Sequence, residues 1–156
     1  MTDDIRDQLR RDHESVLAEL ESLRSEHDEQ RSLARLRQLR RSWVIHALAE
    51  ETVVYRALEG IEAANDSSSR ADERFVEHEL VEGLFDKLTR SRPGTLEWHA
   101  RINVARDLIM RHIETEHAET FNGLAQRFDS EQLAELRRRF LLAREKLTML
   151  EEAKAA

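Results

Sequence analysis

The sequence predicts an all-α protein, an up-down-up-down four-helix bundle with an additional C-terminal helix. Three observations favour this fold class. Apolar residues recur at helical spacing along most of the 156 residues, helix breakers are limited to four glycines and one proline, and four histidines lie 33, 32 and 34 residues apart. Few breakers predict few, long helices, and the bundle is expected over residues 1–127, with the extra helix at 128–156.

The first helix is expected to begin after a cap at Thr2 or Asp3 and to carry His13 on its apolar stripe. A polar segment at 25–30 predicts a turn. The second helix then places three side chains on one inward stripe and ends near Gly60, where Gly60 followed by Ile61 resembles a C-terminal cap. These three side chains are Trp43, His46 and Glu50.

After a loop at 65–69, Ser69 and Asp72 resemble a capping box for the third helix, whose buried stripe includes His78. The segment 91–94, with its Pro-Gly pair, predicts the end of that helix.

The fourth helix is expected from Thr95 to about Leu124, with His112 and Glu116 on its stripe. Asp129, with Gln132 three residues later, predicts the cap of a fifth helix. This last helix has apolar residues on one side, from Leu133 to Leu150, and can pack on the bundle or form a homodimer.

A period near 33 residues is also found in helical repeat arrays, but each such repeat normally holds two short helices. Here each period holds one long helix and one break, which favours the bundle. An antiparallel bundle returns to the same height once per helix, so the four spaced histidines are expected in one layer, about halfway along the helices. They are His13, His46, His78 and His112.

Two of these histidines have a glutamate four residues later that lies on the same apolar stripe: Glu50 follows His46 and Glu116 follows His112. A single inward histidine is usually a hydrogen-bonded core residue. Four in one layer with two buried carboxylates favour a metal site, because a cation offsets the cost of burying the carboxylates. His27, His99 and His117 are not expected to bind metal.

The chain has no cysteine, so its metal ligands must be nitrogen and oxygen. Six donors suit two adjacent ions or one ion with more donors than it needs. Two ions fit better, each held by histidines of two neighbouring helices and bridged by the two glutamates. Iron is favoured, with zinc and manganese as alternatives. Glu51 and Glu79 are candidate hydrogen-bond partners for the ligands.

The order of a histidine, then His-x-x-x-Glu, then a histidine, then His-x-x-x-Glu on successive helices resembles the hemerythrin-like (HHE cation-binding) family over about residues 5–125. The resemblance implies two irons, one bound by His13 and His46 and the other by His78 and His112. It also implies bridging by the two glutamates and by an oxo or hydroxo group. Family members bind dioxygen, sense oxygen or redox state, respond to nitric oxide or peroxide, or handle iron.

Two positions depart from the oxygen-carrying hemerythrins. Glu82 stands where those proteins have a second histidine on the third helix, and His117 stands where they have an aspartate, whose role would pass to Glu116. Glu82 either replaces a neutral histidine ligand or leaves that coordination position to water. Both alternatives alter the charge of the site and the access of small ligands to the metal. The resemblance therefore does not imply reversible oxygen carriage.

The sequence thus predicts a non-haem di-iron protein that binds or reacts with a small ligand: O2, peroxide or NO. Whether it turns over as an enzyme is left open, because iron storage or delivery without turnover also fits. A metal-free helical adaptor that dimerises through its last helix is a further alternative. A net charge of −7 argues against nucleic acid as a partner. The acidic N-terminus, and the lack of an apolar run of about 20 residues, predict a cytoplasmic protein without a membrane span.

Overall fold

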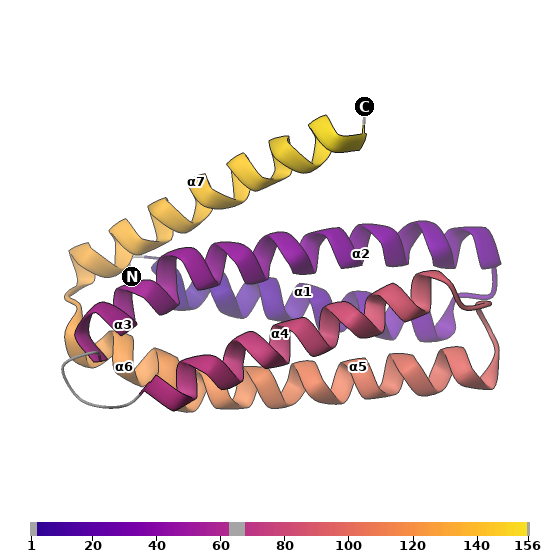
Figure 1. The fold of residues 1–156 in the computed structure, drawn as a ribbon, viewed down its shortest axis with the longest axis horizontal. Coiled ribbons are helices and arrows are strands. Elements are labelled where there is room, and N and C mark those ends of the chain that lie inside the picture. Colours follow the sequence, from indigo (N-terminus) through magenta and orange to yellow (C-terminus); the bar gives the residue numbers. More distant parts are fainter. Residues whose placement is uncertain (1–2, 63–67, 156) are drawn as a thin grey trace.

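The computed structural model describes the backbone of residues 3–62 and 68–155, and over these ranges it is helical with no strand. The predicted all-α class is therefore confirmed. Figure 1 shows long helical rods side by side and a last helix leaning across one side of them. The rods are α1 (Ile5–Ser25); α2 (Glu29–Glu50) continued by η1 (Glu51–Tyr55) and α3 (Arg56–Glu62); α4 (Ser68–Thr89); and α5 (Leu96–Thr115) continued by η2 (Glu116–Thr120) and α6 (Phe121–Arg127). The last helix is α7 (Ser130–Ala155).

Each rod packs against two others. Helix α1 contacts α2 and α5, and α4 contacts the same two helices, so the four rods enclose one common interior. The α1–α2 turn and the α4–α5 turn lie at the same end of the bundle in Figure 1. Side chains on four inward stripes therefore meet along the axis of the bundle.

The helix starts follow local capping chemistry, with one correction. Helix α1 is capped by Asp4, whose side chain accepts a hydrogen bond from the backbone N–H of Arg6. The backbone N–H of Asp4 in turn donates to the Asp7 carboxylate. The prediction of Asp3 as the cap is wrong, and Thr2 lies outside the described residues. The cap predicted at Asp129 is confirmed, because Asp129 exchanges two hydrogen bonds with Gln132. Thr95, where the fourth helix was expected to start, is the cap of α5, and its Oγ1 accepts a hydrogen bond from Trp98 N.

The predicted turns agree in place with the breaks in the structure. The first spans 26–28, and the second, 90–95, contains Gly94 at a φ of 79°, a left-handed conformation that glycine adopts without a steric penalty. The predicted end at Gly60 is wrong, because α3 continues to Glu62. Helix α4 already begins at Ser68, while the rest of the predicted loop at 65–69 and the side chains of the Ser69–Asp72 capping box lie outside the described part of the chain.

Two short π-helical segments interrupt the predicted second and fourth helices. Segment η1 begins directly after Glu50, and segment η2 begins at Glu116. A π-helical turn holds one more residue than an α-helical turn, so it rotates the side chains that follow. Such segments are frequent at functional sites, and here one starts directly after, and the other at, the glutamate of a His-x-x-x-Glu motif.

The core consists of two hydrophobic clusters. The first fills the bundle near the two turns and the second fills the opposite end, where α7 takes part in it. The first contains Val16, Leu20, Leu23, Leu36, Leu39, Trp43, Val81, Phe85, Leu88, Trp98, Ile102, Ala105 and Ile109. The second contains Ile5, Leu9, Ala49, Val53, Val54, Tyr55, Leu58, Phe121, Leu124, Leu133, Leu136 and Phe140.

Helix α7 packs its first half on α1, α2 and η1. Leu133, Leu136 and Phe140 are buried there, whereas Leu150 near the end of the helix is 57% exposed. Most of the apolar stripe considered for self-association is therefore already covered by the bundle. None of the described helices combines the length and the apolar character that crossing a membrane requires.

Candidate metal centre

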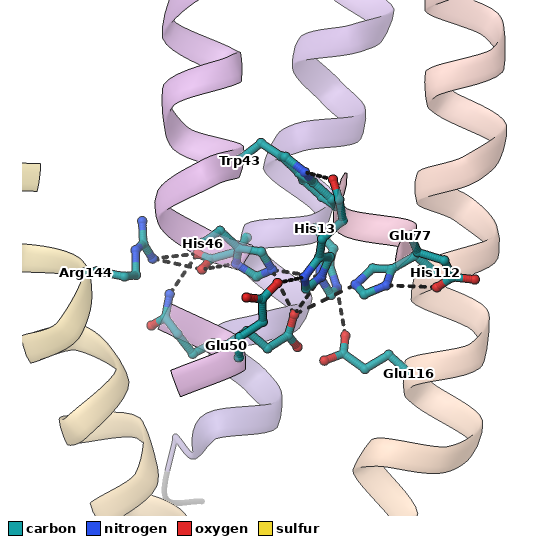
Figure 2. A network of polar contacts seen from close by, with 12 residues as sticks. His13, Trp43, His46, Glu50, Glu77, His112, Glu116 and Arg144 are labelled. Carbon is teal, nitrogen blue, oxygen red and sulfur yellow. Dashed lines mark hydrogen bonds and ion pairs between the residues drawn. The ribbon is translucent and has the colours of Figure 1, made fainter. Parts of the chain in front are cut away.

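The structure brings all six sequence-predicted donor side chains into one layer between the two hydrophobic clusters. His13, His46, His78 and His112 come from α1, α2, α4 and α5, and each is between 1 and 3% exposed. Glu50 and Glu116 are 0 and 1% exposed. Figure 2 shows the labelled members of this layer converging from different helices on one point inside the bundle.

The four imidazoles are close neighbours. Ring centroids are 4.9 Å apart for His13 and His46, 5.4 Å for His13 and His112, and 4.7 Å for His78 and His112. The Nε2 atoms of His13 and His46 lie 3.1 Å apart. The predicted common height of the four spaced histidines therefore agrees with the geometry.

Glu50 occupies the middle of this group. Its Oε2 atom lies 3.6 Å from His46 Nε2 and 3.3 Å from His78 Nε2. The same oxygen is 3.9 Å from His112 Nε2, and Glu116 Oε2 is 3.3 Å from His13 Nδ1. Glu50 thus approaches histidines of both predicted pairs, which is the placement that a bridging carboxylate needs.

Several polar atoms of the layer are buried without a hydrogen-bond partner among the described residues. They include both carboxylate oxygens of Glu50 and of Glu116. Leaving a buried polar group unpaired costs free energy, and a charged group costs more, so natively folded proteins rarely retain such a set without a ligand. The others in the layer are His13 Nδ1, His78 Nε2 and His112 Nε2.

This donor set fits a transition-metal cation. Metal–ligand bonds of about 2.0–2.2 Å place two ligand atoms of one ion roughly 3–4 Å apart, and the separations around Glu50 fall in that range. One ligand atom each from His13, Glu50 and His112 lies within 4.8 Å of the other two. Imidazole nitrogen with carboxylate oxygen suits iron, zinc or manganese.

Three of the histidines are held from outside by an acidic residue at Nδ1. His46 Nδ1 is 3.1 Å from Asp12 Oδ2, and His78 Nδ1 is 2.8 Å from Glu51 Oε1. His112 Nδ1 is 3.3 Å from Glu77 Oε2. A carboxylate that accepts the Nδ1 proton leaves Nε2 with its lone pair directed inward, so these acids orient the rings for metal binding.

Of the two outer partners expected from sequence, Glu51 lies against His78, whereas Glu79 is exposed on α4 and is not part of the layer. Asp12 and Glu77 were missed. A signal for both exists in the sequence, because each directly precedes one of the spaced histidines. A step of one residue turns a helix by about 100°, so these acids point to the flank, toward the neighbouring helix.

Glu82, whose role the sequence left open, forms an ion pair away from the layer. Glu82 Oε1 lies 3.2 Å from Arg40 Nη2, and the side chain is 40% exposed, so its carboxylate lies at the surface between α2 and α4. His27 and His117 are exposed and His99 is half-buried near the α5 end of the turn at 90–95. All three lie outside the layer.

Burial sets the protonation of the imidazoles. It lowers the pKa of His13 well below the usual range, with a smaller contribution from the neighbouring His46, and it also lowers the pKa of His112. Burial acts in the same direction on His78, but Glu50 and Glu51 outweigh it and raise the pKa of His78 to about 9. His13 and His112 are therefore ready to bind a cation, while His78 must first lose a proton.

The pKa values of Glu50 and Glu116 are shifted in opposite directions. Burial and the charge of Glu50 raise the pKa of Glu116 well above its usual value. Burial also acts to raise the pKa of Glu50, yet contacts with Glu116 and His78 hold that pKa well below the usual value. Two carboxylates buried in one layer cannot both carry a charge without a positive partner, and a cation bound between them would supply that partner.

Trp43 and Tyr55 close the layer on either side. The Trp43 indole lies 5.5–5.9 Å from the rings of His46, His78 and His112, and its N–H donates to the His78 carbonyl. On the other side Tyr55 stacks on His78 at 5.9 Å, and its hydroxyl has no hydrogen-bond partner within the described ranges. Burial and the charges of Glu50 and Glu116 raise the pKa of Tyr55, so the phenol keeps its proton.

The fold and the layer define a class: a helical bundle with a buried cation site made of histidine and carboxylate side chains. A family model described as the hemerythrin HHE cation binding domain matches residues 4–124. The chain belongs to this family, and the resemblance seen in the sequence is confirmed. All six donors lie inside the matched region, whereas α7 lies beyond it.

A curated relative from Nostoc sp. (strain PCC 7120 / SAG 25.82 / UTEX 2576), named as a DNA nickase, is 25% identical over 143 residues. The alignment covers 92% of this chain but 40% of the relative. The chain therefore spans less than half the length of that protein. No solved structure gives a significant match.

Proposed function

We propose that this chain is a non-haem di-iron protein whose buried site binds or reacts with O2, peroxide or NO. The observation that carries the proposal is the layer of four imidazoles and two carboxylates whose unpaired atoms meet between two apolar clusters. His13 and His46 would hold one iron, and His78 and His112 the other. Glu50 and Glu116 would bridge the two.

Each residue has a defined task in this proposal. The imidazoles supply neutral nitrogen donors, and Glu50 reaches both pairs of histidines. Bound iron would supply open coordination positions and electrons for a small ligand. The protonated hydroxyl of Tyr55, close to both carboxylates, is available to donate a hydrogen bond to that ligand.

Burial limits the ligand to a small molecule. Every donor is at most 3% exposed, and Trp43 covers the layer on one side. The phosphate backbone of DNA cannot reach such a site without opening the bundle, and the net charge of −7 opposes DNA binding. We therefore do not transfer the nickase activity named for the Nostoc relative, most of whose length lies outside the similarity.

The first test is elemental analysis of protein purified without oxygen. We expect about two iron ions per chain. Reduced, iron-loaded protein is then mixed with O2, peroxide and NO in a stopped-flow spectrometer, and at least one of them should change the iron absorption within seconds. Protein without stoichiometric metal would refute the proposal and favour the metal-free adaptor. Nicking of supercoiled plasmid by the iron-loaded chain would refute the restriction to small ligands.

A second candidate, iron storage or delivery without turnover, shares the same ligand set. Multiple-turnover mixing separates the two functions, because a catalyst consumes many equivalents of ligand, whereas a store reacts once per site. Tyr55→Phe sharpens the result. We expect it to keep the iron content and to change the rate of the ligand reaction, because it removes only the buried hydroxyl.

A homodimer through α7 remains a separate proposal. Leu142, Met149 and Leu150 are exposed near the C-terminal half of this helix, while the apolar residues of its first half are covered by the bundle. Light scattering after size-exclusion chromatography tests it directly. A dimeric mass that becomes monomeric on Leu150→Lys would support it, and a monomeric wild-type mass would refute it.

A further inference from the structure

Helix α7 lies outside the part of the chain that matches the family, yet it reaches the layer. Phe140 of α7 is fully buried and meets the ring of His46 edge-on, with centroids 5.9 Å apart. One turn later, the guanidinium of Arg144 lies 5.8 Å from the Phe140 ring. Figure 2 shows Arg144 approaching on the side of His46, opposite Glu77 and His112. A segment beyond the matched domain thus forms one wall of the candidate centre.

Arg144 contacts the acid that holds His46. Its Nη1 atom lies 2.9 Å from Asp12 Oδ1 and 2.8 Å from Asp12 Oδ2. Asp12 Oδ2 is in turn 3.1 Å from His46 Nδ1, and Gln8 donates to Asp12 Oδ1 at 3.0 Å. The Asp12 side chain is only 14% exposed, so these partners replace most of its hydration.

The contacts link Arg144 to His46 through Asp12. With its two oxygens shared by Arg144, Gln8 and His46, the Asp12 carboxylate cannot rotate freely. A fixed Asp12, 3.1 Å from His46 Nδ1, holds the imidazole ring so that its Nε2 atom faces Glu50 Oε2 in the layer. Without Arg144, Asp12 would lose the partner that contacts both of its carboxylate oxygens and helps to hold it in place.

We propose that Arg144 of α7 is a positioning residue of the metal centre, acting through Asp12 on His46, so that docking of α7 and metal binding stabilise each other. The proposal rests on the proposed function, because it requires a metal at the layer. By linkage, the factor by which docked α7 tightens metal binding equals the factor by which the metal tightens the docking of α7.

The expected size follows from the position of Arg144. Losing a residue that directly holds a metal-binding histidine typically weakens metal binding by about 10- to 100-fold. Arg144 acts one contact further out and is 34% exposed, so we expect Arg144→Ala to weaken binding by about tenfold, the lower end of that range. Arg144→Lys keeps a positive charge near Asp12 and should recover most of the affinity.

Arg138→Ala is the matched control, because Arg138 lies on the same helix and pairs with Glu135 of that helix. Metal affinity is measured by competition with a chelator, and the geometry at the metal by the visible spectrum of cobalt-loaded protein. We expect a weaker affinity and an altered cobalt spectrum for Arg144→Ala, with wild-type values for Arg138→Ala. A purely structural role of Arg144 would lower the melting temperature without moving the cobalt bands.

The reverse direction is tested on the wild-type chain by hydrogen exchange. Amides of α7 around Phe140 and Arg144 should exchange more slowly when metal is bound, and Asp12→Asn should remove that difference. This arm does not depend on whether Arg144→Ala folds. The inference would be overturned if the wild type bound metal but its α7 amides exchanged equally fast with and without metal, and if Arg144→Ala had the same metal affinity as Arg138→Ala. The proposed function would then remain intact. Failure of the wild type to bind metal would instead overturn the proposed function, and the inference with it.

Discussion

The two halves of the bundle carry the same pattern of donors. In the first half, α1 supplies His13, and α2 supplies His46 and Glu50 just before η1. In the second half, α4 supplies His78, and α5 supplies His112, with Glu116 at the start of η2. In both halves the acid that precedes the first histidine supports the second one: Asp12 holds His46, and Glu77 holds His112.

The halves differ in what surrounds this pattern. Glu51, which follows Glu50, holds Nδ1 of His78, whereas the equivalent residue after Glu116 is the exposed His117. His13 consequently has Glu116 near its Nδ1 in place of an outer acid. Asp12 is further held by Arg144 of α7, while Glu77, besides His112, pairs among the described residues with Arg111, which lies 3.6 Å away and is 72% exposed. The comparison teaches that the two predicted metal positions have similar ligands but unequal support.

The largest effects are expected from the ligands themselves, in either half. His46→Ala and Glu116→Ala should each lower bound iron well below two per chain, because each removes a donor that neighbouring side chains cannot replace. His99→Ala should leave the iron content unchanged. Elemental analysis measures all three, and equal losses would show that the ligand set is wrongly assigned.

The next effects concern the acids shared by the two halves. Asp12→Asn and Glu77→Gln should each weaken metal binding by about 10- to 100-fold, because the amide no longer accepts the Nδ1 proton with a full charge. Chelator competition gives both numbers. A loss in one half and none in the other would break the equivalence of the two patterns.

An effect in one half only is expected at the position where the halves differ. Glu51→Gln should weaken metal binding by about 10- to 100-fold through His78, as expected for a residue that directly holds a metal-binding histidine. His117→Ala, at the equivalent place in the second half, should leave the affinity as it is. If His117→Ala proved as damaging as Glu51→Gln, the asymmetry described here would be wrong.

The smallest effect is expected for Arg111→Ala. An exposed ion pair contributes about 0–1 kcal/mol and is screened by salt, so removal of this side chain should change metal affinity by less than about threefold at physiological ionic strength. The same titration at low and high salt provides the check. A tenfold loss of metal affinity would make Arg111 as important as Arg144. The two halves would then no longer differ in how Asp12 and Glu77 are held.

Much of the site could be predicted from the sequence because its signal is local. A His-x-x-x-Glu motif places both side chains on one helix face in any helix, and near-equal spacing brings the histidines of four antiparallel helices to one height. The caps at Thr95 and Asp129 are equally local. The acids that hold the histidines at Nδ1 were harder to predict, because the packing of the helices decides whether the flank of a helix faces solvent or a neighbouring helix. Glu51 and Glu79 were indistinguishable in the sequence, yet only Glu51 is turned toward the layer.

The sequence by itself determined the helical class and the six candidate donors, since both follow from the spacing of residues along the helices. The tertiary structure alone decided the rest. It carried α3 past Gly60 and placed π-helical turns at Glu116 and directly after Glu50. The tertiary structure also brought Arg144 into contact with Asp12, 132 residues earlier in the chain. A contact between segments so far apart depends on how α1 and α7 pack, which no local sequence pattern specifies.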